Sequence, residues 1–381
     1  MTDVAIVGGG VIGCAAAYYL TEAGASVTLL ERDGLAGEAS GAAAGLLIPP
    51  AIYLLRQDTH LALKQAEALP AGALRDLGLA SLRLYPSLVD ALRDETGSDV
   101  QYKATGILLV AQTEGRAEAL RALVRRQQES GPSLEWVEGE PLRRLEPGLS
   151  PALTGAAYSP EERHVNAALL TEALAGAAAS RGAVLRRGAA VSRFLVSDSR
   201  VVAVCTGDGD KIAADHIVLA AGPWTRPLAR RLGFDVPTRP MRGQMLAYRT
   251  SAVRHILWGD EGYLVPKAGG FLYAGATVED IGFRPTTTRR GLAWLRRMAR
   301  GLVPALRHGE VASAWAGLRP GSPDGHPIIG RLPGKDNVYV ATGHFRNGIL
   351  LGPITGKLIA QLITEGKTET SLAPFSAARF G

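Results

Sequence analysis

Two polar side chains in apolar surroundings are the residues of this 381-residue chain best suited to chemistry. Arg319 lies between Trp315-Ala-Gly-Leu and Pro320-Gly. An arginine in such a setting is unusual unless it is paired. It either forms a structural ion pair or binds a ligand carboxylate, which its planar guanidinium grips with two hydrogen bonds. Tyr263, between Gly262 and Leu-Val-Pro, is either a packed core residue or a second donor to that carboxylate.

A glycine triplet follows the first apolar strand, which we expect over Asp3–Val7. The spacing is Gly-x-Gly-x-x-Gly at Gly8, Gly10 and Gly13, and a helix is expected over residues 14–23. Gly8 permits a tight turn, Gly10 lets the backbone approach a pyrophosphate, and Gly13 lets the helix pack closely on the strand. Unpaired amides at the helix N-terminus favour phosphate groups there. The pattern predicts a dinucleotide-binding turn.

A run of very small residues comes after the second expected strand, at residues 26–30. That strand is closed by Glu31, whose carboxylate can accept hydrogen bonds from a ribose. The run is Glu38-Ala-Ser-Gly-Ala-Ala-Ala-Gly45, where an NAD-dependent dehydrogenase would continue to alternate helix and strand. Small residues allow the backbone to approach a large flat group. A flavin is therefore favoured over a nicotinamide, with a flexible loop as the alternative.

Two further segments end in glycine-rich turns near the expected ligand. Residues 216–222 form an apolar strand that can be buried on both faces and that ends in Gly222. Residues 341–348 connect a strand at 338–341 to a helix expected from about residue 353 to 363. A helix N-terminus there could stabilise the negative charge of a reduced flavin. His344 is a conceivable base, but its position in the turn suits a backbone contact to the cofactor better.

These residues resemble the D-amino-acid-oxidase-like superfamily, and most closely the glycine oxidases of thiazole biosynthesis. The resemblance covers nearly the full chain. Besides the triplet, Glu31 and the loop 39–45, it is carried by residues 216–224, 239–244, 262–266, 272–277, 315–321, 324–325 and 342–351. The last two stretches are specific to the glycine-oxidase branch, whereas the triplet is shared far more widely.

The resemblance implies FAD as cofactor, oxygen as electron acceptor, and hydrogen peroxide, ammonia and an oxo acid as products. Substrate contacts fall at Tyr263, Arg319 and Arg346, the last being a second carboxylate contact or a partner beside a lid. Cofactor contacts fall at Val11, Ile12, Glu31, Arg32, Ala39, Ser40, Ala44, Gly45, Leu46 and Val191, and at His344, Phe345, Arg346, Asn347, Gly348, Ile349 and Leu350. Relatives with covalent flavin use a cysteine near the position of Arg319, so FAD is expected to be non-covalent.

The expected fold is α/β, with an FAD-binding Rossmann-like domain and a second, mainly antiparallel β substrate domain, as in D-amino-acid oxidases. The FAD-binding domain is expected to contain residues 1–85, 150–225 and 315–381, and the substrate domain residues 86–149 and 226–314. Strands of the substrate domain are expected at residues 241–249, 262–266 and 271–276. The breaker-rich stretch 317–334 predicts a loop between strands.

Composition restricts the partners and the compartment. The formal net charge of +6 comes without a basic run interleaved with aromatics, so no nucleic acid is expected. No apolar run reaches the roughly eighteen residues of a membrane span. Only two cysteines, Cys14 and Cys205, occur, and no basic segment precedes Val4, so we expect no metal site, no secretory signal and a cytoplasmic location. The sequence leaves a homo-oligomer open.

The leading function is oxidation of glycine or a small secondary amine such as sarcosine. Alternatives are an oxidase of an N-substituted glycine, a dehydrogenase with another electron acceptor, and a flavin-binding protein without turnover. Trp258 and Glu261 put the substrate in question, because the strand period would place Glu261 on the same face as Tyr263. There it would repel the acid of glycine and favour an N-substituted glycine. The alternative is that Glu261 is a solvated turn residue.

Overall fold

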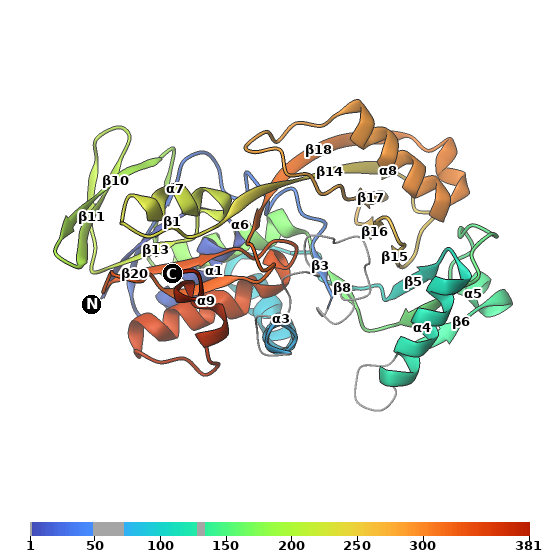
Figure 1. Cartoon of the computed structure of the whole chain (residues 1–381), viewed down its shortest axis with the longest axis horizontal. Coiled ribbons are helices and arrows are strands. Elements are labelled where there is room, and N and C mark those ends of the chain that lie inside the picture. The colour runs from blue at the N-terminus through green and yellow to red at the C-terminus, as the bar shows by residue number, and fades with distance from the viewer. Residues whose placement is uncertain (1, 49–71, 128–133) are drawn as a thin grey trace.

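Two large β-sheets lie side by side along the long axis of the molecule (Figure 1). The computed structural model describes residues 2–48, 72–127 and 134–381. Both termini of the chain lie in the half that contains strands β1, β13 and β20 (Figure 1). The other half contains the second sheet with helices α4, α5 and α8. The long strands β14 and β18 of this second sheet extend toward the first half.

The first sheet has six strands and is parallel except at one edge. In order across the sheet they are β19 (Ile328–Arg331), β20 (Val338–Thr342), β13 (His216–Leu219), β1 (Asp3–Val7), β2 (Ser26–Glu31) and β9 (Val184–Arg187). Only β19 runs antiparallel to its neighbour. The central strands β1 and β13 are apolar throughout most of their length because both faces of a parallel sheet are covered.

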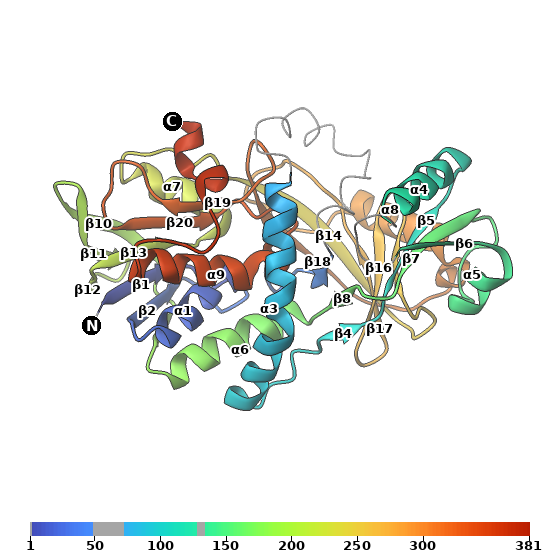
Figure 2. The same ribbon diagram turned by 90° about the horizontal axis from the view of Figure 1, so that it is seen from below.

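Different layers cover the two faces of this sheet. One face packs on α1 (Val11–Glu22), α3 (Ala73–Thr96), α6 (Ala167–Ser180) and α9 (Gly348–Thr364), which share one apolar core. The other carries α7 (Thr225–Arg230) and a small antiparallel sheet of β10 (Val191–Ser197), β11 (Arg200–Thr206) and β12 (Lys211–Ala213). Alanines let the first layer pack closely: Ala15, Ala16 and Ala17 of α1 are fully buried. In Figure 2, α3 crosses the molecule between the two halves.

The second sheet has eight strands, and all neighbours are antiparallel except β15 and β5. In order they are β18 (Val311–Gly321), β14 (Arg239–Arg249), β17 (Phe271–Gly275), β16 (Tyr263–Lys267), β15 (Ile256–Trp258), β5 (Ile107–Ala111), β7 (Gly155–Ser159) and β6 (Glu135–Val137). Alternate residues of these strands enter two cores. One core includes α4 (Glu114–Gln127), and the other includes α5 (Gly139–Leu145) and α8 (Arg289–Leu302).

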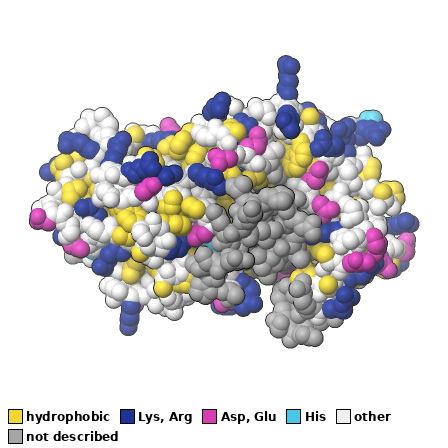
Figure 3. Space-filling model, in the orientation of Figure 1, with side chains coloured by type: hydrophobic (Ala, Val, Ile, Leu, Met, Phe, Trp, Pro, Cys, Tyr) yellow, Lys and Arg dark blue, Asp and Glu magenta, His cyan; other side chains and the backbone are white. Residues whose placement is uncertain are grey.

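Short elements complete the described chain. A three-stranded sheet of β3 (Leu46–Leu47), β8 (Arg163–His164) and β4 (Lys103–Ala104) lies between the two halves. The 3₁₀ turns are η2 (Gly222–Trp224), η3 (Pro304–Arg307), η4 (Ala373–Phe375) and η5 (Ala377–Phe380). No helix within the described ranges is long and apolar enough to span a bilayer. Lys and Arg side chains are scattered over the face drawn in Figure 3 rather than gathered in one patch.

Helix α9 begins at Gly348, five residues before the predicted start near residue 353. The predicted start is wrong because Pro353 lies inside the helix, a position that proline disfavours. Proline leaves the carbonyl four residues earlier, that of Ile349, without its helical donor. The Tyr85 hydroxyl of α3 donates to that carbonyl, and the Ser81 hydroxyl donates to the carbonyl of Leu350 at 2.5 Å. Neighbouring α3 therefore stabilises a helical turn that the local sequence disfavours.

Three other boundaries differ from the prediction. Helix α1 begins at Val11 rather than residue 14, and β13 ends at Leu219, after which Gly222 opens a 3₁₀ turn. The predicted loop at 317–334 is wrong for its first five residues, which belong to β18, and for Ile328–Arg331, which form β19. β18 is an edge strand, so Pro320 costs no hydrogen bond on its open side.

The division into domains stays a proposal, and the packing suggests two adjustments. Helix α3 crosses the proposed boundary at residue 85, and its buried Leu88 and Leu92 lie in the same core as α1 and α9. β7 (Gly155–Ser159) lies in the eight-stranded sheet, although residues 150–225 are assigned to the FAD-binding domain. We propose that the whole of α3 belongs to the first domain and β7 to the second.

Candidate active site

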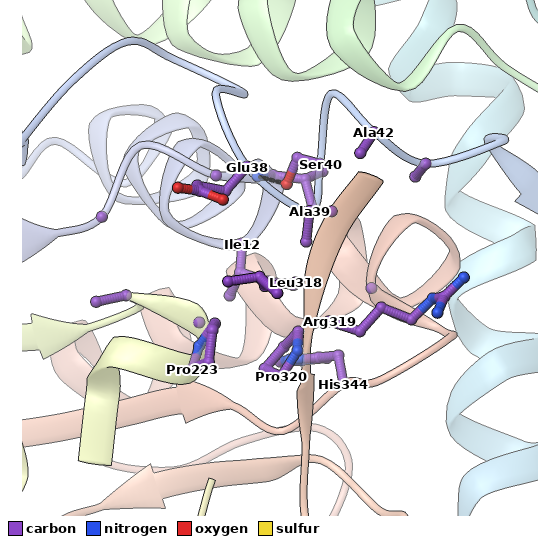
Figure 4. Close-up of a pocket in the computed structure, with 18 of the residues that line it drawn as sticks. Ile12, Glu38, Ala39, Ser40, Ala42, Pro223, Leu318, Arg319, Pro320 and His344 are labelled. Carbon is purple, nitrogen blue, oxygen red and sulfur yellow. Dashed lines mark hydrogen bonds between the residues drawn. The ribbon is translucent and has the colours of Figure 1, made fainter. Parts of the chain in front are cut away.

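A cavity of about 380 Å³ lies between the two large sheets. This volume is within the range of small-molecule sites, which are typically about 300–1,000 Å³. Its walls come from the carboxyl ends of β1, β2 and β13, from the loop after β2, from β14, β16 and β18, and from the start of α9. Figure 4 shows this meeting point, with Ile12 and Ser40 on one side of β18 and Arg319 on the other. Ligands in parallel α/β sheets bind at such carboxyl ends.

The glycine-rich turn brings the N-terminus of α1 to the cavity. Gly8, Gly10, Val11 and Ile12 line it. Gly13 does not, because it lies against the turn itself: a Cβ there would be 1.9 Å from the Gly8 carbonyl oxygen. Gly13 therefore serves the close packing of helix on strand. The cavity end of α1 offers a helix N-terminus to an anion.

Glu31 is held by backbone amides at the end of β2. Its Oε2 accepts a hydrogen bond from the Gly9 amide at 2.7 Å, and its Oε1 accepts one from the Asp33 amide at 2.9 Å. Next to it, Arg32 donates to Glu38 at 2.7 Å, and its guanidinium lies 4.0 Å from the ring centroid of Trp224. These contacts fix the polar end of the cavity.

Strand β18 holds the loop of small residues against the cavity. The Trp315 indole donates to the carbonyl of Ala42 at 3.0 Å. A Cβ on Gly317 would be 2.6 Å from the Cβ of Ala42, so only glycine permits this approach. Two residues earlier in the loop, the Ser40 hydroxyl accepts from the Val11 backbone amide at 2.9 Å and so connects the loop to α1. The close approach of this loop to a flat ligand stays a prediction; the contacts here are with β18 and α1.

His344 lies at the turn that leads into α9. It is 2% exposed, and its Nε2 lies 3.0 Å from the Thr355 hydroxyl. Burial lowers the pKa of His344 to about 3, so the imidazole is neutral at physiological pH. Its Nδ1 is a buried atom for which the described residues supply no hydrogen-bond partner. A ring fixed in this way suits a contact to a bound group better than proton transfer.

Arg319 reaches the cavity across the backbone of β14. Its guanidinium occupies the space next to Gly243, where a Cβ would be 2.2 Å from Nη1. Nη1 donates to the carbonyl of Thr277 at 3.0 Å. In Figure 4, Arg319 and Leu318 point to opposite sides of β18, as the strand period requires. Arg319 also has at least one further interaction, so it is not free of partners.

Tyr263 lies on β16, on the side of β14 opposite to β18, and its side chain reaches the same face of β14. Its hydroxyl donates to the sulfur of Met245 at 3.7 Å, and its ring centroid lies 5.3 Å from that of Trp258. Gly243 and Met245 are two residues apart, so they share one face of β14 at a spacing of about 7 Å. The strand therefore brings Arg319 and Tyr263 together in one cavity, which both line together with Trp258.

Glu261 lies elsewhere than its proposed role requires. It is exposed, it forms part of a bend before β16, and it does not line the cavity. The strand period does not extend to Glu261 because β16 begins only at Tyr263. The interpretation of Glu261 as a residue that repels the substrate acid is therefore wrong, and that of a turn residue holds.

Most residues proposed from the sequence meet at this cavity. Those that line it are Gly8, Gly10, Val11, Ile12, Glu31, Arg32, Ala39, Ser40, Ala44, Gly45, Leu46, Val191, Gly222, Tyr263, Arg319, His344, Phe345, Arg346, Gly348 and Ile349. Gly13, Asn347 and Leu350 do not line it. Asn347 is the N-cap of α9, and Leu350 lies in the core with α1.

Sequence reasoning missed several lining residues of β14 and of the segment after β17. They include Gly243, Met245, Ala276 and Val278. The spacing of Gly243 and Met245 within an expected strand could have indicated that they share one face, but it could not show that this face lines the cavity. Among the described residues, no cluster of three or more His, Cys, Asp or Glu side chains could hold a metal ion.

The residues present fit a dinucleotide that carries a flavin. The N-termini of α1 and α9 both open on the cavity, which suits phosphate groups at one and an electron-rich ring edge at the other. Glu31 could hold a ribose, the small-residue loop could lie along a flat ring, and the buried Nδ1 of His344 could meet a polar ring atom. Arg319 and Tyr263 would then face the ring from the second sheet.

Comparison with known proteins places the chain. The model of the FAD dependent oxidoreductase family matches residues 3–362. A glycine oxidase of Geobacillus kaustophilus is 36% identical over 382 residues, which are 99% of this chain and 97% of the relative. The bifunctional protein ThiO/ThiG of Trichormus variabilis is also 36% identical over 99% of this chain, but the chain spans only 55% of that protein.

Solved structures agree with the sequence matches. The crystal structure of the glycine oxidase from Geobacillus kaustophilus superposes with a TM-score of 0.89 at 34% identity, covering 99% of this chain and 98% of that one. Iminodiacetate oxidase from Chelativorans sp. gives a TM-score of 0.86 at 26% identity, covering 98% of each chain. The chain thus belongs to the FAD-dependent oxidoreductases of this family and is similar to their glycine oxidases. The predicted family, fold class and enzyme class are confirmed, as is the dependence on FAD.

Proposed function

We propose that this enzyme binds FAD non-covalently and oxidises the C–N bond of glycine or of a small secondary amine such as sarcosine. Oxygen would accept the electrons, giving hydrogen peroxide, an oxo acid and ammonia or an amine. The observation that carries the proposal is the pairing of Arg319 and Tyr263 over Gly243 and Met245, in the same cavity as the glycine-rich turn. The names of the similar proteins, glycine oxidase and iminodiacetate oxidase, support it.

The chain's own residues would act mainly by orientation. Arg319 would bind the substrate carboxylate through two parallel hydrogen bonds, and Tyr263 would donate a further one. The Tyr263 hydroxyl presently donates to the Met245 sulfur, which is a weak acceptor, so a carboxylate oxygen is a favourable replacement. When bound there, FAD would supply the capacity to accept a hydride equivalent, and these residues would hold the substrate carbon for it. Fixing that carbon in place provides much of the catalysis.

Protons would be handled without a dedicated base among the cavity residues described above. Burial keeps the His344 imidazole neutral, and its contact with Thr355 fixes the ring. The amine must lose its proton before the carbon is oxidised, and we propose that it enters the site in the neutral form. The N-terminus of α9 would stabilise the negative charge that develops on the ring system.

Non-covalent attachment is supported by the positions of the cysteines. Cys14 and Cys205 are free thiols, both are buried, and neither lines the cavity. Burial raises the pKa of Cys14 far above its ordinary value, which keeps the thiol protonated and unreactive. Two free, buried thiols also fit the reducing cytoplasm that we propose as the location.

A second candidate substrate is an N-substituted glycine that carries another acidic group. Arg346 lines the same cavity as Arg319, and its guanidinium carbon lies 5.2 Å from the ring centroid of Phe345. Two guanidinium groups in one cavity would suit a dicarboxylate. The case for an N-substituted glycine therefore depends on Arg346 and not on Glu261, which does not line the cavity.

The test is peroxide formation by the purified enzyme with glycine, sarcosine, iminodiacetate and methylamine. The three acids should be oxidised and methylamine, which has no carboxylate, should not. Equal rates with methylamine would contradict the carboxylate clamp. Bleaching of the flavin by glycine without peroxide would indicate a dehydrogenase, and no bleaching by any amine would indicate a flavin-binding protein without turnover.

A further inference from the structure

A buried polar network lies on the face of β14 opposite to Gly243 and Met245, the face at which we propose that the substrate carboxylate binds. Arg242 and Gln244 alternate with the lining residues Gly243 and Met245, so they point to the opposite face. Arg242 is 5% exposed and Gln244 is fully buried. Burying such groups is costly unless their hydrogen bonds are made. Neither side chain lines the cavity.

The network converges on the carboxylate of Glu279. Its Oε1 accepts from Gln244 Nε2 and from the Thr277 hydroxyl, each at 2.7 Å. Its Oε2 accepts from Arg242 Nη2 at 2.5 Å. Burial opposes the charge, but these three hydrogen bonds hold the pKa of Glu279 below its ordinary value. The carboxylate therefore stays ionised and keeps its three donors.

Thr277 connects this network to Arg319. The Thr277 hydroxyl accepts a hydrogen bond from the backbone amide of Gln244 at 2.9 Å and donates one to Glu279. Its carbonyl, on the other side of the chain, accepts from Arg319 Nη1 at 3.0 Å. The backbone beyond Thr277 is also tied down, because Arg242 and Glu279 exchange two backbone hydrogen bonds, of 2.8 and 3.0 Å.

The fixed segment also forms part of the cavity wall. Val278, between the two tethered residues, lines the cavity and is 40% exposed. Loss of the tether would release both the carbonyl that holds the guanidinium and this wall. An arginine has many rotamers, so holding it in one of them before substrate binds lowers the entropy cost of binding.

We propose that the Thr277 hydroxyl and the Glu279 carboxylate position Arg319, and thereby set the affinity for the substrate carboxylate without touching the substrate. The inference rests on the proposed function, since it takes Arg319 to be the carboxylate ligand. It makes Thr277 and Glu279 positioning residues of the site. The expected signature is weaker carboxylate binding with unchanged cofactor content.

The test compares Thr277→Val, which keeps the size of the side chain and removes its hydroxyl, with Thr277→Ser, which keeps the hydroxyl. Each FAD-loaded variant is titrated with glycolate, a carboxylate without the amine, while the visible spectrum of the flavin is followed. Loss of a buried hydrogen bond costs about 1–3 kcal/mol, so Thr277→Val should raise the dissociation constant of glycolate roughly 5- to 150-fold. Thr277→Ser should bind nearly as the wild type does.

A matched control and a second variant separate this effect from misfolding. Asp280→Asn changes the next residue, whose ion pair with Arg239 at 2.9 Å is exposed and lies outside the network, and glycolate binding should be unchanged. Glu279→Gln should weaken glycolate binding and raise KM for glycine more than it lowers kcat. FAD content should stay the same in every variant.

Three outcomes would overturn different parts of the argument. If Arg319→Ala weakens glycolate binding but Thr277→Val and Glu279→Gln do not, the positioning role is overturned and the proposed function stands. If Arg319→Ala leaves glycolate binding unchanged, the proposed function fails and this inference fails with it. If Thr277→Ser weakens binding as much as Thr277→Val does, the hydroxyl is not the positioning group.

Discussion

Arg319 is acceptable in an apolar part of the molecule because its neighbours provide both space and partners. The missing side chain of Gly243 provides the space, and the Thr277 carbonyl accepts one of the five guanidinium hydrogens. The chemistry of this residue therefore depends on a glycine on one strand and a carbonyl beyond the end of another.

Arg319→Ala should remove the carboxylate clamp. Leaving a desolvated charge without its partner costs about 2–5 kcal/mol, so kcat/KM for glycine should fall by about 30- to several-thousand-fold. The measurement is steady-state peroxide production at saturating FAD. Arg239→Ala is the matched control, because Arg239 is on the neighbouring strand β14 and its ion pair is exposed. A decrease of less than about threefold in Arg319→Ala would contradict the clamp.

Glu31→Gln should weaken FAD binding and leave the rate of the saturated enzyme nearly unchanged. A glutamine cannot accept from both the Gly9 and Asp33 amides, because one of its two terminal atoms is a donor. The proposed ribose hydrogen bond to the charged carboxylate would be weakened as well, at a cost of about 1.5–3 kcal/mol, so the FAD dissociation constant should rise roughly 10- to 150-fold. Fluorescence titration of the deflavinated protein with FAD measures it, and Glu22→Gln, at the far end of α1, is the control. Equal affinity would mean that Glu31 only ends the strand.

The strand β16 connects the three-stranded sheet to the loop of small residues at 38–45 through the partly buried Lys267. Lys267 donates to the carbonyl of Val165 at 2.7 Å, and Val165 donates its amide to the carbonyl of Gly45 at 2.9 Å. The Lys267 ammonium also lies 3.3 Å from His164 Nδ1 and faces the ring of Tyr273. Burial lowers the pKa of Lys267 from 10.5 to about 7, and burial also lowers that of His164, to about 3.

This lysine should make the stability of the fold depend on pH. Below pH 7 both folded and unfolded chains carry the proton, and the cost of burying the charge is present in full. Between about pH 7 and 10.5 only the unfolded chain keeps it, so the free energy of unfolding rises with pH, by at most about 1.4 kcal/mol per unit.

Lys267→Met removes this proton and should therefore flatten the pH dependence. We expect the wild type to gain stability relative to Lys267→Met as the pH rises from about 7 to about 9, measured by urea unfolding at fixed FAD concentration. Lys211→Met, at an exposed position of β12, should run parallel to the wild type. If the free energy of unfolding of Lys267→Met also changes with pH as that of the wild type does, the pKa of Lys267 is not lowered by folding.

For the whole molecule, the cavity exists only while the two sheets stay together. Its walls come from stretches of chain that are far apart in the sequence, and neither cysteine is among them. The purified protein should be yellow, and acid or heat should release intact FAD into the supernatant, because the proposed attachment of the cofactor is non-covalent. The absorbance of pellet and supernatant after precipitation is the measurement. Colour that stays with the pellet would mean a covalent bond.

Local patterns in the sequence determine much of this protein. The glycine triplet, the strand at Asp3–Val7 and the acid at Glu31 lie within the first 31 residues, and each is found where the sequence predicts it. Residue type and apolar surroundings also single out Arg319 and Tyr263, and both line the cavity, while their binding of a carboxylate stays a prediction. Short-range geometry decides such features, so the sequence alone can specify them.

Long-range contacts decided the rest. The start of α9 depends on Tyr85, which is 264 residues from Ile349 in the sequence, and the face shared by Arg319 and Tyr263 depends on the register of β18, β14 and β16. Glu261 could not be placed from the period of two, because that period begins only where β17 pairs with β16. Strand pairing and the partners of buried polar groups join residues that no local pattern relates, so the tertiary structure alone assigned Thr277 and Glu279 to the site.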